Sequence, residues 1–247
     1  MLRQAELHQG VAVLTLDSPP ANALTSADTK ELADVLIALA AQPEAPAVVL
    51  TGAGERFFCA GGDIKELDSA PIELALERMS LFHRLLVALE RYPRPICAAV
   101  NGYAVGGGLE LTLFADTVIA VPAARFGFPE INHGVLPAVK GIREAARKVG
   151  PAGARRLLYT GDIVECAEAL ELGLVNRVVD REELLPAAIE AATEAGQKPP
   201  LLFAAIKRAI QQTGGWSDDQ LEEATLDDMR SYFGSPAARS ARGRWRS

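Results

Sequence analysis

The 247-residue sequence has few cysteines, no long apolar run and fewer basic than acidic residues. Its three cysteines, Cys59, Cys97 and Cys166, are widely spaced and form no CxxC pair. This disfavours a disulfide framework or structural zinc site and indicates a reducing, cytoplasmic compartment. No stretch approaches about 18 uninterrupted apolar residues, so we expect no transmembrane helix. The N-terminus has no apolar run behind a basic start, so we expect no signal peptide.

The charge balance argues against polyanionic partners. Lys and Arg number 25 against 32 Asp and Glu, giving a net charge of −7. Such a surface repels nucleic acid and anionic membranes. Hydrophobic residues make up 49% and charged residues 23% of the chain, which is typical of a globular protein with one sizeable core.

Predicted strands alternate with predicted helices, which indicates an α/β fold. We expect strands at 11–16, 47–51, 96–100, 117–120, 124–127 and 176–179, and helices at 25–41, 72–91, 109–114, 151–160, 166–172, 184–197, 201–213 and 218–233. Pro199-Pro200 is the best candidate boundary. It divides an α/β core of residues 1–198 from a C-terminal helical segment of residues 199–247, whose polar tail carries Arg239, Arg242, Arg244 and Arg246.

Two glycine-rich segments are the features of the sequence that most directly indicate a chemical function. Ala60-Gly61-Gly62-Asp63 and Gly106-Gly107-Gly108 each follow a predicted buried strand and precede a helical pattern. Glycine lets the backbone approach a ligand closely, and a helix start offers free N–H groups. Two such loops could aim two N–H groups at a carbonyl oxygen that gains negative charge. Tight turns in a packed core are the alternative, and a phosphate loop is disfavoured because no GxxxxGK[ST] motif is present.

Both loops, together with Phe128-Pro129-Glu130-Ile131, resemble the enoyl-CoA hydratase/isomerase (crotonase) superfamily, and the closest resemblance is to enoyl-CoA hydratase. The resemblance covers nearly the whole chain, from Leu14 through the segment between Gly161 and Val179. It implies a crotonase-like spiral of ββα units followed by a C-terminal helical segment that mediates trimerisation. Trimers of this family commonly pair as hexamers.

The resemblance also implies the catalytic groups. The backbone N–H groups of Gly62 and Gly107 would form an oxyanion hole for a thioester carbonyl. Glu110 and Glu130 would hold a water between them, Glu130 delivering or removing the α-proton and Glu110 helping to activate the water. The implied reaction is the reversible hydration of a 2-enoyl-CoA to a 3-hydroxyacyl-CoA.

The implied substrate is an acyl-CoA, with no separate cofactor and no metal. The expected substrate-binding residues surround the first loop: Ala23, Ala60, Asp63, Ile64 and Lys65. Lys207, Arg208 and the arginines of the tail are further basic residues, which we interpret mostly as solvated surface charges.

One segment departs from the family pattern. The run from Ala138 to Gly141 keeps only one of two paired glycines and contains the bulkier Val139-Lys140. This leaves a Δ3-Δ2 enoyl-CoA isomerase, or another acyl-CoA lyase or hydrolase of the family, as an alternative. A catalytically silent acyl-CoA-binding or RNA-binding member is a third possibility, weakened by the acidic charge and by the presence of both glutamates. His133 and Cys59 are interpreted as structural.

Overall fold

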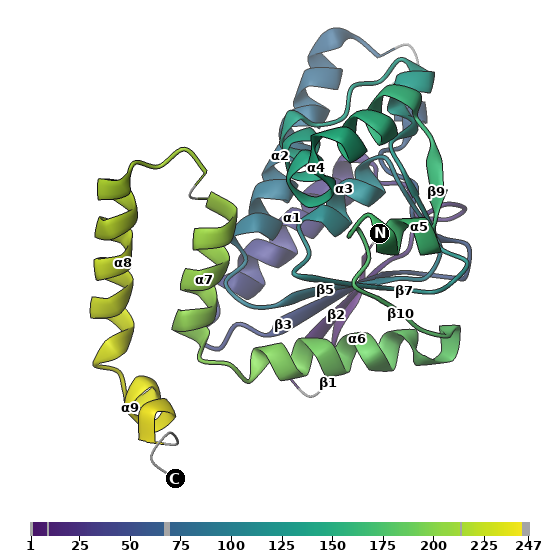
Figure 1. Ribbon diagram of the computed structural model, residues 1–247. Coiled ribbons are helices and arrows are strands. Elements are labelled where there is room, and N and C mark those ends of the chain that lie inside the picture. Colours follow the sequence, from purple (N-terminus) through teal and green to yellow (C-terminus); the bar gives the residue numbers. More distant parts are fainter. Residues whose placement is uncertain (1, 9, 67–69, 213, 244–247) are drawn as a thin grey trace.

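The strands form two sheets, and between residues 47 and 127 successive strands alternate from one sheet to the other (Figure 1). The computed structural model describes residues 2–8, 10–66, 70–212 and 214–243. The larger sheet has the order β1 (Leu2–His8), β2 (Val11–Leu16), β3 (Ala47–Gly52), β5 (Ile96–Val100), β7 (Thr117–Ala120), β10 (Arg177–Val178). The smaller sheet has the order β4 (Phe57–Cys59), β6 (Tyr103–Val105), β8 (Arg125–Gly127), β9 (Ile163–Glu165).

Helices and short 3-10 turns lie between the strands along the chain, and four consecutive helices end the described part of it. The helices and turns are α1 (Ser26–Ala40), η1 (Ile64–Glu66), α2 (Ile72–Arg91), α3 (Gly107–Leu113), η2 (Pro129–His133), α4 (Val139–Thr160), α5 (Cys166–Glu171), α6 (Arg181–Gly196), α7 (Pro200–Gln212), α8 (Asp218–Phe233) and α9 (Pro236–Gly243). Among the described elements, four units of strand, strand and helix follow one another: β1-β2-α1, β3-β4-α2, β5-β6-α3 and β7-β8-α4. In the last three, the two strands lie in different sheets. This confirms the expected spiral of ββα units.

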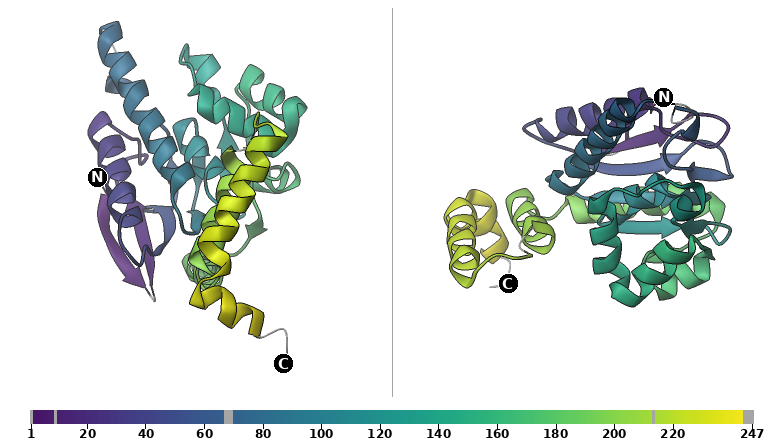
Figure 2. Two further views of the ribbon diagram at one scale, coloured as in Figure 1. Left: turned by 90° about the vertical axis from the view of Figure 1, so that its left-hand side faces the viewer. Right: turned by 90° about the horizontal axis from the view of Figure 1, so that it is seen from above.

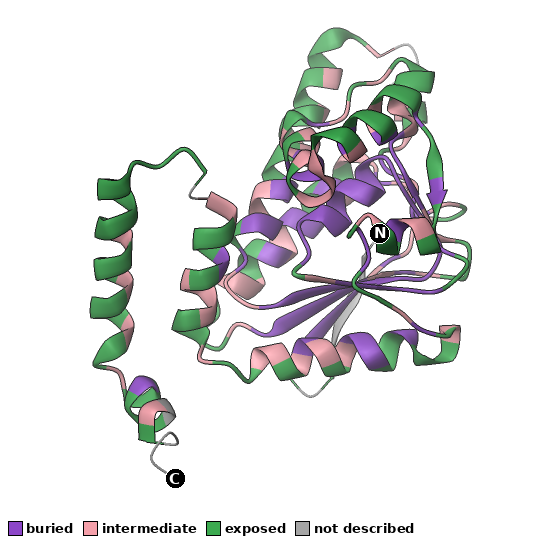
Figure 3. Ribbon diagram, viewed as in Figure 1, coloured by how far each residue is buried: buried purple, intermediate pink, exposed green. Residues whose placement is uncertain are grey.

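The central strands are buried because helices cover the larger sheet. β3 and β5 pair in parallel and are almost wholly apolar, as strands buried on both faces are. α6 packs against β3, β5 and β7, and α1 packs against α2 (Figure 1). Figure 3 shows the resulting contrast between the buried strands and the largely exposed C-terminal helices.

Several elements differ from the sequence-based expectation. α4 is interrupted at Gly150, whose φ of 71° and ψ of 165° are not helical, so a helical stretch does begin at Pro151 as expected, and a preceding stretch that begins at Val139 was not predicted as a separate helix. α3 begins at Gly107 and not at Leu109. β1, β4, β6, β9 and α9 were not predicted. β4, β6 and β9 have three residues each, too few for a periodic pattern to be recognised.

The C-terminal helices extend away from the two sheets (Figure 1, Figure 2). An ion pair connects α7 to the core: Nζ of Lys207 lies 2.7 Å from Oδ2 of Asp116. Lys207 is only 6% exposed, so interpreting it as a solvated surface charge is wrong. Within the described ranges, no helix combines the length and apolar character needed to cross a bilayer. Arg244 and Arg246 lie outside the described residues.

Candidate active site

The two glycine loops leave the same edge of the smaller sheet and touch each other. β4 and β6 pair in parallel, so their carboxyl ends lead to one place. A β-carbon at Gly61 would lie 2.9 Å from the nitrogen of Gly107, and Gly61 has a φ of +88°. A β-carbon at Gly108 would lie 2.0 Å from the carbonyl oxygen of Cys59. Glycine is therefore required at these positions both for close approach and, at Gly61, for backbone conformation.

The backbone around Gly62 is held by a parallel bridge to Leu24. Leu24 N–H donates to the carbonyl of Gly61 at 2.8 Å, and Asp63 N–H donates to the carbonyl of Leu24 at 2.9 Å. In this pairing the N–H of Gly62 itself faces away from Leu24. Gly107 is the first residue of α3, where N–H groups have no partner within the helix. Two neighbouring loops thus present the amides of Gly62 and Gly107.

Glu110 projects from the first turn of α3 into the interior and is 2% exposed. The pKa of the Glu110 carboxyl is raised to about 8, mainly by burial and to a smaller extent by repulsion from Glu130. A hydrogen bond from the backbone of Ala138 opposes this shift. Oε1 of Glu110 is buried and has no hydrogen-bond partner among the described residues. A β-carbon at Gly141, in the first turn of α4, would lie only 1.9 Å from that oxygen.

Glu130 lies in η2, opposite the start of α3. A β-carbon at Gly106 would stand 3.0 Å from Oε1 of Glu130, so this carboxyl lies directly beside the second glycine loop. Burial raises its pKa as well, and its Oε2 is also buried without a partner in the described part of the chain. A buried carboxyl oxygen without a partner costs free energy, so two such oxygens mark a place for a polar ligand such as water.

The other predicted site residues form a rim around Gly62. Ala60 N–H donates to the carbonyl of Ala21 at 3.1 Å, which places the 60–65 segment beside residues 21–24. Ala23, Ala60 and Asp63 are half-buried, whereas Ile64 and Lys65 are exposed. Asp63 Oδ1 accepts a hydrogen bond from the Lys65 amide at 3.0 Å. The structure therefore places Ala23 in the segment that pairs with the first loop, which carries the other four expected substrate-binding residues.

Sequence reasoning missed two residues that touch these groups. Gly141 packs on Glu110, and Arg78 of α2 packs on Gly62. The run from Ala138 to Gly141 stands out in the sequence as a departure from the family pattern, but neither contact could be predicted, because each joins distant parts of the chain. Cys59 is buried and its pKa is raised to about 12, which agrees with its interpretation as a structural residue. His133 is exposed at the end of η2.

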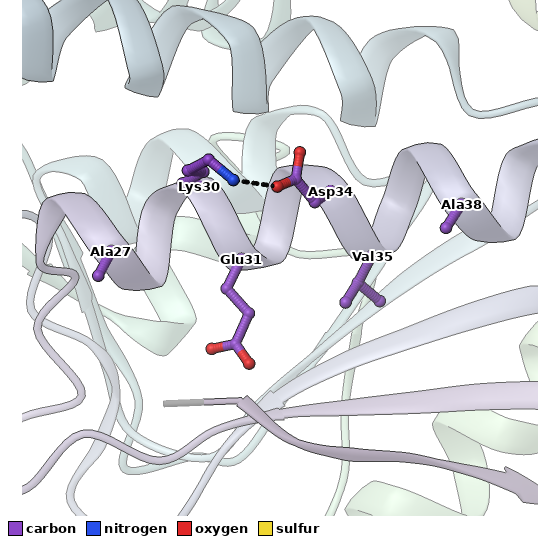
Figure 4. A pocket seen from close by; sticks show the side chains of 6 residues that line it. All are labelled: Ala27, Lys30, Glu31, Asp34, Val35 and Ala38. Atoms are coloured by element: carbon purple, nitrogen blue, oxygen red, sulfur yellow. Dashed lines mark hydrogen bonds and ion pairs between the residues drawn. The ribbon is translucent and has the colours of Figure 1, made fainter.

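A separate hollow of about 470 Å³ lies along α1 (Figure 4). It is lined by Ala27, Lys30, Glu31, Asp34, Val35 and Ala38. None of the residues predicted for the site lines it. Its polar groups include Lys30 and Asp34, which already form an ion pair with each other at 2.7 Å. The glycine loops and the two glutamates are therefore the candidate active site. In the part of the chain that is described, no three His, Cys, Asp or Glu side chains gather as metal ligands.

Comparison with known proteins gives one consistent family. Residues 6–241 match the model of the family described as enoyl-CoA hydratase/isomerase. The chain is 36% identical over 208 residues to crotonyl-CoA hydratase of Syntrophomonas wolfei subsp. wolfei, covering 84% of this chain and 80% of the relative. It is 38% identical over 203 residues to short-chain-enoyl-CoA hydratase of Clostridium acetobutylicum, covering 82% and 78%. The crystal structure of enoyl-CoA hydratase from Bacillus anthracis superposes with a TM-score of 0.89 at 30% identity, covering 95% of this chain and 92% of that one.

Proposed function

The chain belongs to the enoyl-CoA hydratase/isomerase family, and from this premise we propose that it catalyses the reversible addition of water to a 2-enoyl-CoA. The single observation that carries the proposal is a pair of buried carboxyl oxygens, Oε1 of Glu110 and Oε2 of Glu130, for which the described residues supply no hydrogen-bond partner. A hydratase needs two such groups beside a thioester, one to exchange a proton with water and one to exchange a proton with the α-carbon.

The amides of Gly62 and Gly107 act on the thioester oxygen. When the α-carbon loses or gains a proton, the thioester passes through an enolate whose charge lies on that oxygen. Two N–H donors held in place stabilise this charge more than they stabilise the neutral carbonyl. Each such donor contributes roughly 2.7–4 kcal/mol to transition-state stabilisation. This role needs no separate cofactor, because the charge is met by the chain's own amides.

The two glutamates share the proton unequally. Glu110 is the more buried carboxyl and its pKa is raised to about 8, so when the pair shares one proton, that proton resides on Glu110. This state is ready for dehydration. Glu130 removes the α-proton of a 3-hydroxyacyl thioester, the electron pair forms the α,β double bond, and Glu110 protonates the β-hydroxyl, which leaves as water.

Hydration runs the same steps in reverse. Glu110 takes a proton from water as the oxygen bonds to the β-carbon, and Glu130 delivers a proton to the α-carbon. The proton must therefore first move from Glu110 to Glu130, and a water held between the two unpartnered oxygens provides the path. At the end of one hydration Glu110 again holds the proton, so the resting state is restored.

We propose that coenzyme A binds along the rim formed by Ala23, Ala60, Asp63, Ile64 and Lys65. Support comes from the pairing of the segment that contains Ala23 with the loop that contains the other four residues, and from the exposed Lys65, whose ammonium suits an anionic carrier. The half-buried Ala23 and Ala60 offer backbone groups and small side chains that leave room for a ligand.

The proposed function is tested with purified protein and crotonyl-CoA. We expect the absorbance of the conjugated enoyl thioester to fall, and mass spectrometry to show a product heavier by one water. A product of unchanged mass from a 3-enoyl-CoA, with no hydration of crotonyl-CoA, would identify an isomerase instead. No turnover of either substrate would contradict the proposal.

We also propose that the chain assembles as a homotrimer or as a hexamer of two trimers through residues 199–247. α7 and α8 expose apolar side chains along their lengths: Leu201, Leu202, Ile206, Ile210, Leu221, Leu226, Met229 and Phe233. Light scattering on a sizing column would give the mass of the particle, and a monomer would contradict this assignment. A cytoplasmic location is part of the same proposal, supported by three cysteines that are all unpaired.

A further inference from the structure

We propose that Arg78 is a positioning residue that fixes the amide of Gly62 for its task. Arg78 lies in the second turn of α2, and its side chain is only 12% exposed. Nη1 donates to the carbonyl of Asp63 at 2.5 Å, and Nη2 lies 3.5 Å from the carbonyl of Leu24. Asp63 is the residue after Gly62, and Leu24 is the residue that pairs with Gly62 in the parallel bridge. The Arg78 guanidinium therefore contacts the backbone on both sides of this bridge, in the segment of Gly62 and in the segment of Leu24.

The guanidinium also packs directly on Gly62. A β-carbon at Gly62 would lie 2.2 Å from Nη2 of Arg78. The planar cation thus occupies the space where any other residue would carry its side chain. Contact on one face of Gly62, together with the hydrogen bond to the next carbonyl, restricts rotation of the Gly62 peptide. Glycine without such contacts would have the widest conformational freedom of any residue.

Arg78 is itself held in place from a third element. Oε2 of Glu66, in η1, lies 3.6 Å from Nη1 of Arg78. The same Oε2 accepts hydrogen bonds from the backbone N–H and the hydroxyl of Ser26, the first residue of α1, each at 2.9 Å. We call Ser26, Glu66 and Arg78 the Arg78 clasp.

The Arg78 clasp matters because an oxyanion hole stabilises negative charge only when its N–H donors point at that charge. The energy of an N–H donor aimed at a developing charge depends on its direction being set before the reaction. Misplacing a group by about 1 Å can cost on the order of 100-fold in rate. Arginine suits this position because its rigid fork donates to several acceptors at once, whereas lysine offers a point charge on a flexible stem.

The inference rests on the proposed function, since it assumes that the Gly62 amide contacts the thioester oxygen. It predicts a specific defect. Loss of the clasp weakens the interaction with the enolate and leaves the rest of the acyl-CoA site intact. The turnover number should therefore fall while KM changes little. A merely structural role for Arg78 would lower stability, or all binding steps together.

The experiment compares R78K and R78M with the wild type, using E66A as a milder disruption of the same clasp. Arg84→Met is the matched control, because Arg84 lies on the same helix and its side chain is 45% exposed and paired with Asp34. The measurements are kcat and KM for crotonyl-CoA, the thermal unfolding midpoint, and binding of acetoacetyl-CoA. The enolate of acetoacetyl-CoA absorbs in the near ultraviolet, so the spectrum reports how strongly the site stabilises an enolate.

We expect kcat to fall about 10-fold in R78K and about 100-fold in R78M, with KM within about 3-fold of wild type. We expect the enolate band of bound acetoacetyl-CoA to weaken in the same order, and R84M to match the wild type. R78K keeps the charge and remains informative if R78M does not fold. If the wild type hydrates crotonyl-CoA and the R78K and R78M variants behave like R84M, the inference is wrong while the function stands. If the wild type neither turns over crotonyl-CoA nor produces an enolate band, the proposed function itself fails.

Discussion

Gly141 packs against Glu110 so closely that a β-carbon on Gly141 would stand 1.9 Å from the Oε1 atom of Glu110. The two residues come from the first turns of α4 and α3. The remaining glycine in the run from Ala138 to Gly141 is therefore the residue that leaves room for the buried carboxyl. The bulkier Lys140 next to it turns elsewhere, with Nζ 2.6 Å from Oε2 of Glu90.

Substitution of Gly141 by alanine should displace the Glu110 carboxyl and lower hydratase activity. Alanine favours a helix by about 1 kcal/mol over glycine, so secondary structure should be retained. We expect kcat for crotonyl-CoA to fall at least about 10-fold while the circular dichroism spectrum is unchanged. Gly196→Ala is the control, because a β-carbon there would meet its nearest neighbour at an ordinary 3.6 Å. Equal activity in both variants would contradict the contact.

Replacement of Glu130 by glutamine should remove the group that exchanges the α-proton. General acid–base catalysis typically contributes about 10²–10⁴-fold, and kcat should fall within that range. Exchange of the α-proton of bound substrate with deuterated water, followed by mass spectrometry, should be lost in the same proportion. Exchange at the wild-type rate in E130Q would assign the α-proton to another residue.

The raised pKa of Glu110 predicts how stability depends on pH. Below about pH 4.5 both folded and unfolded chains hold this proton. Between pH 4.5 and about 8 the folded chain keeps a proton that the unfolded chain has released, so the free energy of unfolding falls as pH rises. Above about pH 8 this contribution is constant.

Urea unfolding of the wild type and E110Q across this range isolates the effect. E110Q lacks the titrating group, so the gain in stability of E110Q over wild type should grow from pH 4.5 to pH 8 and then level off. Glu130, whose pKa is also raised by burial, contributes a slope of the same sign to both proteins. A difference that does not change with pH would show that Glu110 is not held protonated by burial.

The Lys140–Glu90 ion pair should matter for stability. Glu90 is 8% exposed at its side chain, and the Lys140 ammonium also lies 5.4 Å from the centre of the Phe114 ring. Removing one member of a buried pair typically costs about 3–5 kcal/mol, and K140M should lie near the lower end because Arg143 also contacts Glu90 at 3.3 Å.

The double variant K140M/E90L should recover most of that loss, because it leaves no buried charge unpaired. K30M removes the Lys30–Asp34 pair, whose lysine side chain is 61% exposed, and should cost less than about 1 kcal/mol. Denaturant unfolding measures all three variants. A cost for K140M no greater than that for K30M would contradict the prediction.

Much of the fold could be read from local patterns. Strong periodicity and buried apolar runs predicted α2 at its exact bounds of 72–91 and the central strands β2, β3 and β5 within a residue. β4 and β6 were missed because three residues inside a glycine-rich loop carry no period. The helix start predicted at Pro151 agrees with the break at Gly150, whose non-helical φ of 71° divides α4, because proline suits the first position of a helix.

The sequence by itself determined which groups were available: the glycines of two loops, two glutamates, and the order of strands and helices that brings them to one edge of a sheet. Local chemistry suffices for this, because glycine's freedom and a helix's unpaired amides belong to a few adjacent residues. Only the tertiary structure decided that Glu110 is the more protonated carboxyl, that Gly141 leaves room for it, and that Arg78 lies against Gly62. Burial and repulsion between like charges depend on atoms contributed by elements far apart in the chain. No spacing within the sequence records those distances.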